Sequence, residues 1–73
     1  MIADARALGW VGECWSDPDI DIQNWGASLL DQLLFRNVVD AETAEPLIRV
    51  GEAHANAAVR DAMRAIRRWL ETS

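Results

Sequence analysis

Apolar residues in the last third of the chain recur every three or four positions, from residue 55 onward. This spacing gives an amphipathic helix one apolar face, formed by Val59, Ala62, Met63, Ile66, Trp69 and Leu70. Arginines share the opposite side and gather toward the C-terminal end, where positive charge suits the helix dipole; they are Arg60, Arg64, Arg67 and Arg68. We predict a helix here, with Arg67 paired to Glu71 one turn later.

The segment NWGASLLDQLLFRN (24–37) has the same helical spacing, with an apolar face of Trp25, Gly26, Leu29, Leu30, Leu33 and Leu34. Asn37 is the predicted end of this helix. Residues 1–15 also begin with helical spacing, at Ile2, Ala5 and Leu8. Gly9 and Gly12 weaken that prediction, because glycine disfavours a helix interior.

A further helix is predicted in AETAEPLIRV (41–50). Asp40 could cap it, but a start at Thr43 keeps Pro46 in the first turn, where the missing N–H of proline costs nothing. Glu45 and Arg49 then stand one turn apart in the favourable order. Gly51 predicts a stop or a bend.

The stretch WSDPDIDIQNW (15–25) joins the first two helical segments and carries Asp17, Asp19 and Asp21. An EF-hand calcium loop would need glycine and glutamate where Ile22 and Ser28 stand. A β-hairpin pairing WVGEC with IDIQ is an alternative, although two strands alone are marginal.

A helix start explains more of this stretch. Ser16 as N-cap puts Asp19 at the capping-box position and Pro18 in the first turn. Trp15 and Ile20 would then form a hydrophobic staple. Under this interpretation the aspartates are start signals near the positive end of the helix dipole, and Ile22 enters the core.

The totals fit a single small domain, 1–73, of net charge −5. A chain of this length buries only about 60% of its extended surface, which leaves little room for a deep catalytic cleft. The acidic balance argues against direct nucleic-acid binding, including by a helix-turn-helix. Cys14 is the only cysteine, so no internal disulfide forms, and no apolar run resembles a membrane span or a signal peptide. We expect a cytoplasmic protein.

The chain also contains a weak internal repeat. Shifting residues 17–34 by 37 positions places Ile22 on Val59 and Leu29 on Ile66, so the apolar faces coincide. With Asp17-Pro18 at a turn and Val59-Arg60 at a helix start, this pattern resembles the HEAT-repeat family. The resemblance implies an all-α fold in which four helices form two stacked αα-hairpins, about 1–36 and 40–71. The alternatives are a four-helix bundle, or an α+β fold with a short N-terminal β-hairpin.

Cys14, His54 and Asp61 are the only residues that could supply a nucleophile, a base and an orienting acid. Cysteine catalysis needs a thiolate stabilised by an imidazolium or a helix terminus, and the spacing indicates no such contact. One histidine and one cysteine also give no zinc ligand set. We therefore predict no catalytic residue, no metal site and no cofactor.

The leading functional hypothesis is a non-catalytic interaction module that presents a rigid acidic helical surface to a partner protein with a basic surface. The candidate contact residues are tryptophans, aspartates and arginines: Trp10, Trp25, Asp17, Asp19, Asp21, Arg60, Arg64, Arg67 and Arg68. Two repeats are fewer than a solenoid normally needs, so we expect atypical capping helices, a homodimer or stabilisation by a partner.

The alternative hypothesis is a small phage or mobile-element inhibitor, similar to anti-CRISPR proteins, that blocks a basic nucleic-acid-binding surface. Its carboxylates would imitate phosphates through charge alone. The acidic residues concerned are Glu13, Asp17, Asp19, Asp21 and Asp31.

Overall fold

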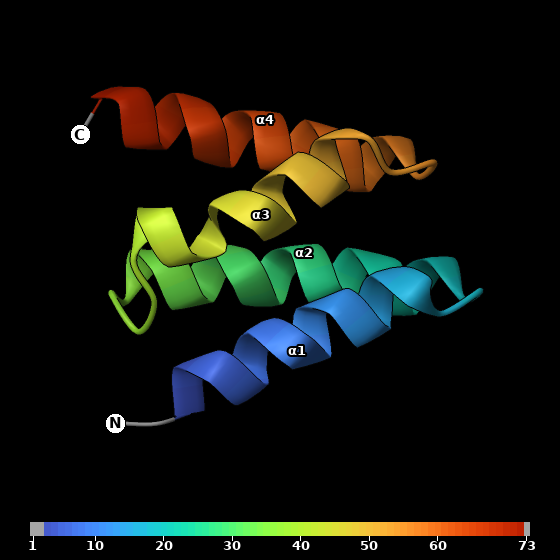
Figure 1. Ribbon diagram of the computed structural model, residues 1–73. Coiled ribbons are helices and arrows are strands. Elements are labelled where there is room, and N and C mark those ends of the chain that lie inside the picture. The colour runs from blue at the N-terminus through green and yellow to red at the C-terminus, as the bar shows by residue number, and fades with distance from the viewer. Residues whose placement is uncertain (1–2, 73) are drawn as a thin grey trace.

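The computed structural model describes the backbone of residues 3–72 and the side chains of residues 7–72. The described chain folds into four helices: α1 (Ala3–Ser16), α2 (Ile20–Phe35), α3 (Ala41–Glu52) and α4 (Ala57–Thr72) (Figure 1). The predicted apolar positions Ile2 and Ala5 lie outside the described side chains. The segments proposed to pair as a β-hairpin are both helical, so that alternative is wrong.

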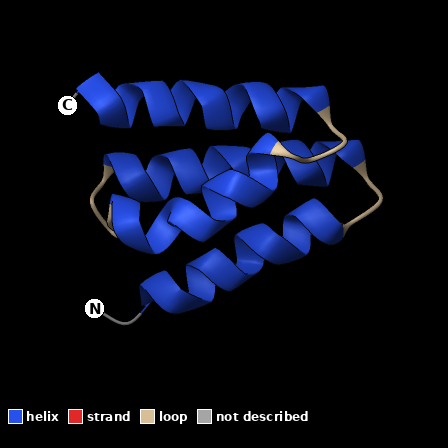
Figure 2. Cartoon of the chain, turned by 45° about the horizontal axis from the view of Figure 1, so that its top comes forward, coloured by secondary structure: helices blue, strands red, loops and turns tan. Residues whose placement is uncertain are grey.

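The helices pair as two hairpins, α1 with α2 and α3 with α4. Figures 1 and 2 show α2 and α4 running side by side, with α1 and α3 crossing them at an inclination. Between the hairpins α2 contacts α4 and α1 contacts α3, whereas α1 and α4 do not meet within the described chain. An up-down bundle would place α1 next to α4. The predicted all-α fold of two stacked hairpins is therefore confirmed, as a flat body of 30 × 27 × 16 Å.

The start of α2 lies three residues later than predicted. Ser16 ends α1 and its hydroxyl donates to the Gly12 carbonyl at 3.0 Å. Asp19 is the N-cap, accepting from the Asp21 N–H at 2.9 Å, and Asp17 accepts from the Asp19 N–H at 2.8 Å. The prediction of Ser16 as the cap was wrong because α1 continues through both of its glycines. That continuation carries Trp15 into the core.

The predicted staple between Trp15 and Ile20 is also absent. Trp15 is buried, whereas 62% of the Ile20 surface is exposed. Ile22, expected in the core, is 39% exposed. Ile20 is the first residue of α2, so it lies at the end of the helix, beyond the core that Ala27 and Leu34 enter further along the same face. Ile22 lies at the edge of the buried face of α2, which is formed by Gly26, Ala27, Leu30 and Leu34.

The end of α2 agrees with the sequence. Asn37 adopts a left-handed conformation, φ 57°, directly after the last turn. Its N–H donates to the Leu34 carbonyl at 3.1 Å, and the Val38 N–H donates to Leu33 at 2.9 Å. These two bonds form a Schellman motif, which satisfies carbonyls that the helix leaves unpaired.

α3 begins earlier than predicted. Asp40 is its N-cap and accepts from the Thr43 N–H at 2.7 Å, so Thr43 already lies inside the helix. Pro46 consequently stands in the helix interior. The side chain of Pro46 is exposed, so water can reach the carbonyl that the missing N–H leaves unpaired. The Asp40 cap and water access together allow the earlier start.

The core combines residues of all four helices. Its largest fully buried side chains are Val11, Leu30, Ile48, Val59 and Met63. The burial pattern of α2 matches that of α4 with a shift of 36 positions, which pairs Ala27 with Met63 and Leu30 with Ile66. The helix bounds keep the predicted shift of 37, since Ile20–Phe35 falls on Ala57–Thr72.

Candidate functional site

A polar junction joins the two hairpins where α2 and α4 begin. The Asn56 side-chain amide donates to the side-chain Oε1 of Gln23 at 3.0 Å and to the side-chain Oδ1 of Asn24 at 2.9 Å. Gln23 in turn donates to the Asp17 carbonyl at 2.7 Å. These bonds fix the N-terminal end of α4 against α2, which sets the two helices side by side.

His54 belongs to this junction. Its Nδ1 accepts from the Asn56 backbone N–H at 3.0 Å, so Nε2 carries the proton and donates to the Trp15 carbonyl at 2.8 Å. The imidazole ring also lies 6.3 Å from the Trp15 rings, centroid to centroid. Both ring nitrogens are therefore used for structure.

No hydrogen bond or ion pair in the described chain joins the residues considered as nucleophile, base and acid, which are Cys14, His54 and Asp61. Burial, with the charges of Glu13 and Asp17, raises the pKa of the Cys14 thiol, which opposes thiolate formation. Asp61 lies 3.5 Å from Arg64, across one turn of α4. Among the described residues no group of three histidine, cysteine or carboxylate side chains could hold a metal ion.

The arginines of α4 do not form one free stripe. Arg60 donates to the carbonyls of His54 and Ala55, at 2.7 and 2.9 Å, and so closes the turn before α4. Arg64 and Arg68 are exposed, and within the described residues Arg64 forms one ion pair, with Asp61.

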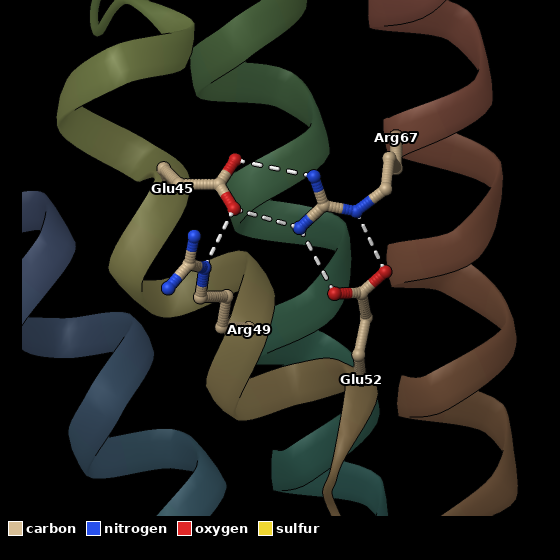
Figure 3. Close-up of polar contacts among 4 residues, drawn as sticks. All are labelled: Glu45, Arg49, Glu52 and Arg67. Carbon is tan, nitrogen blue, oxygen red and sulfur yellow. Dashed lines mark hydrogen bonds and ion pairs between the residues drawn. The ribbon is translucent and has the colours of Figure 1, made fainter.

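Arg67 binds two carboxylates of α3 (Figure 3). Its Nε and Nη2 donate to both Glu52 oxygens, at 2.7 and 2.9 Å. Its Nη1 and Nη2 donate to both Glu45 oxygens, at 3.3 and 2.8 Å, and Arg49 adds a bond to Glu45 at 3.0 Å. The predicted pair of Arg67 with Glu71 is wrong, because the two glutamates offer bidentate partners across the helix interface.

This cluster shifts the ionisation of its members. Hydrogen bonds from Arg67 hold the pKa values of Glu45 and Glu52 below their ordinary value, and Arg49 assists at Glu45. The same carboxylates raise the pKa of Arg67. All three groups stay charged at neutral pH, so Arg67 holds α4 to α3 and is not available to a partner.

An open groove runs between α2 and α4, with a volume of about 650 Å³. Small side chains, including Ala27, Ala62 and Ala65, make up much of its lining. It extends from Asn24 to Phe35 along α2, which corresponds to about 17 Å or three helical turns. A groove of this length and lining matches the backbone of one further helix.

An aromatic pair lies at one end of this groove. The rings of Phe35 and Trp69 are 6.5 Å apart, centroid to centroid, and inclined by 41°. Phe35 is 69% exposed and Trp69 is 43% exposed. Exposed aromatic side chains beside an apolar groove are typical of protein-binding surfaces.

Of the other predicted contact residues, Trp10 and Trp25 lie on the surface, 53% and 61% exposed. Neither lines the α2–α4 groove. Asp17 and Asp19 each give one carboxylate oxygen to the turn before α2. Asp21 is exposed in the first turn of α2. The structure thus places the predicted tryptophans and aspartates on the first hairpin and the arginines on the second.

The sequence did not predict the groove between α2 and α4. Phe35 extends the apolar run of α2 past the predicted face, and alanines recur at 58, 62 and 65 on one side of α4. These two signals identify apolar surface, but only the parallel arrangement of α2 and α4 brings them together.

Comparison of the chain with protein-family models, with curated proteins and with solved structures gives no match. The HEAT-repeat resemblance therefore stays a prediction, although the two hairpins are observed. In the described part of the chain no helix has both the length and the apolar character needed to cross a bilayer.

Proposed function

We propose that this protein is a non-catalytic interaction module that binds another protein through the α2–α4 groove. The observation that carries the proposal is the apolar groove with Phe35 and Trp69 exposed at one end. A chain this small gains stability by burying aromatic side chains, so leaving two of them exposed beside a groove favours a binding role.

The polar groups of the chain support a structural rather than a catalytic use. His54 binds the Trp15 carbonyl near the end of α1, and Arg60 binds two carbonyls of the α3–α4 turn. Arg67 forms ion pairs with two glutamates. Rigid packing across the hairpins would keep the groove open before a partner arrives, which lowers the entropy cost of binding.

Photo-crosslinking in cells tests this proposal. A benzoylphenylalanine at Ser28, an exposed groove residue, should give a covalent adduct with a reproducible protein partner. The same group at Val50, which is 54% exposed on α3 outside the groove, is the matched control. Adducts at neither position, or the same adducts at both, would refute a binding role for the groove.

A second candidate is the charge-mimicking inhibitor, which the distribution of acidic residues favours. Residues 7–36 contain five acidic side chains and one arginine, Arg36, whereas residues 37–73 contain six acidic side chains and five arginines. The uncompensated negative charge therefore lies on the first hairpin, where it could oppose a basic nucleic-acid channel.

The salt dependence of the binding affinity distinguishes the two proposed functions. A complex held by charge mimicry should lose about a hundredfold or more in affinity when salt rises from about 0.1 M to about 1 M, because the Debye length falls from about 10 to about 3 Å. A complex held by apolar contacts in the groove should lose far less. Titration of the crosslinked partner at both salt concentrations distinguishes these outcomes.

A further inference from the structure

The charge and shape of the α2–α4 groove also indicate what kind of segment it accepts, provided that the proposed binding function holds. Asp31 is the only charged residue among those that line the groove. Its side chain is exposed, and within the described chain no ion pair or hydrogen bond engages its carboxylate. An unpaired carboxylate beside an apolar lining favours a ligand with one positive charge next to an apolar face.

The first hairpin carries more negative than positive charge. In the described part of the chain Glu13, Asp21 and Asp31 form no ion pair there, and Arg36 is its one arginine, whereas Arg67 on the second hairpin is neutralised by two glutamates. The field near the groove wall formed by α2 is therefore negative. Such a field attracts basic segments and repels acidic ones.

A second copy of this chain fits the groove poorly. Each copy carries a net charge of −5, and no basic residue lines the groove. Two grooves packed face to face would bring two Asp31 carboxylates into one apolar interface without a cation. Unpaired charges in such an interface are costly, so the occupant is a different molecule.

We propose that the groove binds one amphipathic helix of a partner protein. Apolar side chains at i, i+4 and i+7 of that helix would pack on the alanine-rich lining. One larger apolar side chain contacts Phe35 and Trp69, and a lysine or arginine on the flank facing α2 pairs with Asp31.

Two labelled, stapled helical peptides of about 14 residues test this inference. Both carry leucine at i, i+4 and i+7, and they differ only in an arginine or a glutamate on the flank. By fluorescence anisotropy the arginine peptide should bind the wild-type protein about tenfold more tightly than the glutamate peptide. Asp31→Arg should reverse this order.

Glu13→Arg is the matched control, because it changes the net charge equally on an exposed position of α1 that does not line the groove. It should keep the preference for the arginine peptide. Ser28→Trp should fill the groove and abolish binding of both peptides, and Ser28→Arg serves if the tryptophan variant does not keep the helical circular-dichroism spectrum.

Three outcomes would overturn the inference. They are equal binding of the two peptides, equal effects of Asp31→Arg and Glu13→Arg, and a dimer in sedimentation that Ser28→Trp dissociates. If photo-crosslinking at Ser28 captures a partner while neither peptide binds, the interaction function stands and the helical ligand is wrong. If both experiments fail, the groove has no binding role.

Discussion

At the scale of single residues, two glycines mark the closest approaches between helices. A Cβ atom at Gly51 would contact the Met63 side chain and lie 2.9 Å from Trp15 Cη2. A Cβ atom at Gly26 would lie 2.7 Å from the Cys14 Cβ. Gly51 was expected to stop or bend α3, but the helix continues to Glu52. Its lack of a side chain is required by packing.

Gly51→Ala should lower the free energy of unfolding by about 1–3 kcal/mol, because the added methyl group overpacks a rigid contact. Gly9→Ala is the control, since a Cβ there meets open space. That substitution should raise stability by about 0.5–1 kcal/mol, because alanine favours a helix interior. Urea denaturation measures both, and a neutral Gly51→Ala would contradict the packing argument.

At the scale of elements, the ion cluster of Arg67 with Glu45 and Glu52 joins α3 to α4 one turn beyond the buried Ile48 and Met63. Its carboxylates are only about one-third exposed, and each accepts two bonds from the guanidinium. Bidentate geometry distinguishes this cluster from the exposed pair of Arg64 and Asp61.

Arg67→Gln should therefore lower the melting temperature at neutral pH more than Arg64→Gln does. The pKa values of Glu45 and Glu52 are lowered on folding, so their stabilisation is complete above the ordinary value of 4.5. It is lost as the pH falls through the lowered values. The melting temperature of the wild-type protein should decrease as the pH is lowered below about 5.

The melting temperature of the Arg67→Gln protein should decrease less over this pH range. The difference in melting temperature between this variant and the wild type should therefore become smaller in acid. The exposed pair provides the control, because Arg64→Gln should leave the shape of the pH dependence unchanged. Parallel curves for the wild type and Arg67→Gln would show that the cluster does not stabilise the fold.

At the scale of the whole molecule, a single core holds both hairpins. Val11 and Trp15 of α1 belong to the same buried cluster as Leu30 of α2, Ile48 of α3 and Met63 of α4. Neither hairpin encloses an apolar core by itself, because each helix is buried partly by the other hairpin. Folding should accordingly be cooperative.

Leu30→Ala should cost about 2–5 kcal/mol, since Leu30 is fully buried. Because the core is shared, circular dichroism and tryptophan fluorescence should still give one coincident transition. Ile20→Ala removes side-chain atoms that are mostly exposed and should cost much less. Separate transitions for the two probes would indicate that the hairpins unfold independently.

The sequence predicted the helices well and their contacts poorly. Periodic apolar residues predicted α1, α2 and α4, whereas the capping and charge pattern of residues 40–50 predicted α3. Asn37 predicted the end of α2, because periodicity and capping are local properties. The starts of α2 and α3 were misplaced where several adjacent residues could cap. Tertiary packing of Trp15 settled the first of these starts.

The candidate site was less predictable. Exposure of Trp10 and Trp25 agrees with their predicted place on the surface, yet the groove is lined by Phe35 and Trp69 instead. No local sequence pattern indicates which of the four tryptophans becomes buried. Trp15 differs from the other tryptophans because it packs against Gly51 of α3, a residue 36 positions away.

The sequence by itself determined an acidic, all-helical chain, because composition and side-chain spacing act within a few residues along the backbone. Only the tertiary structure decided which aromatic residues are buried, which arginines form ion pairs and where the groove between α2 and α4 lies. Each of those depends on partners distant in the sequence, such as Glu45 for Arg67 and Trp69 for Phe35. The first of these contacts forms when α4 packs on α3, and the second forms when the second hairpin packs on the first.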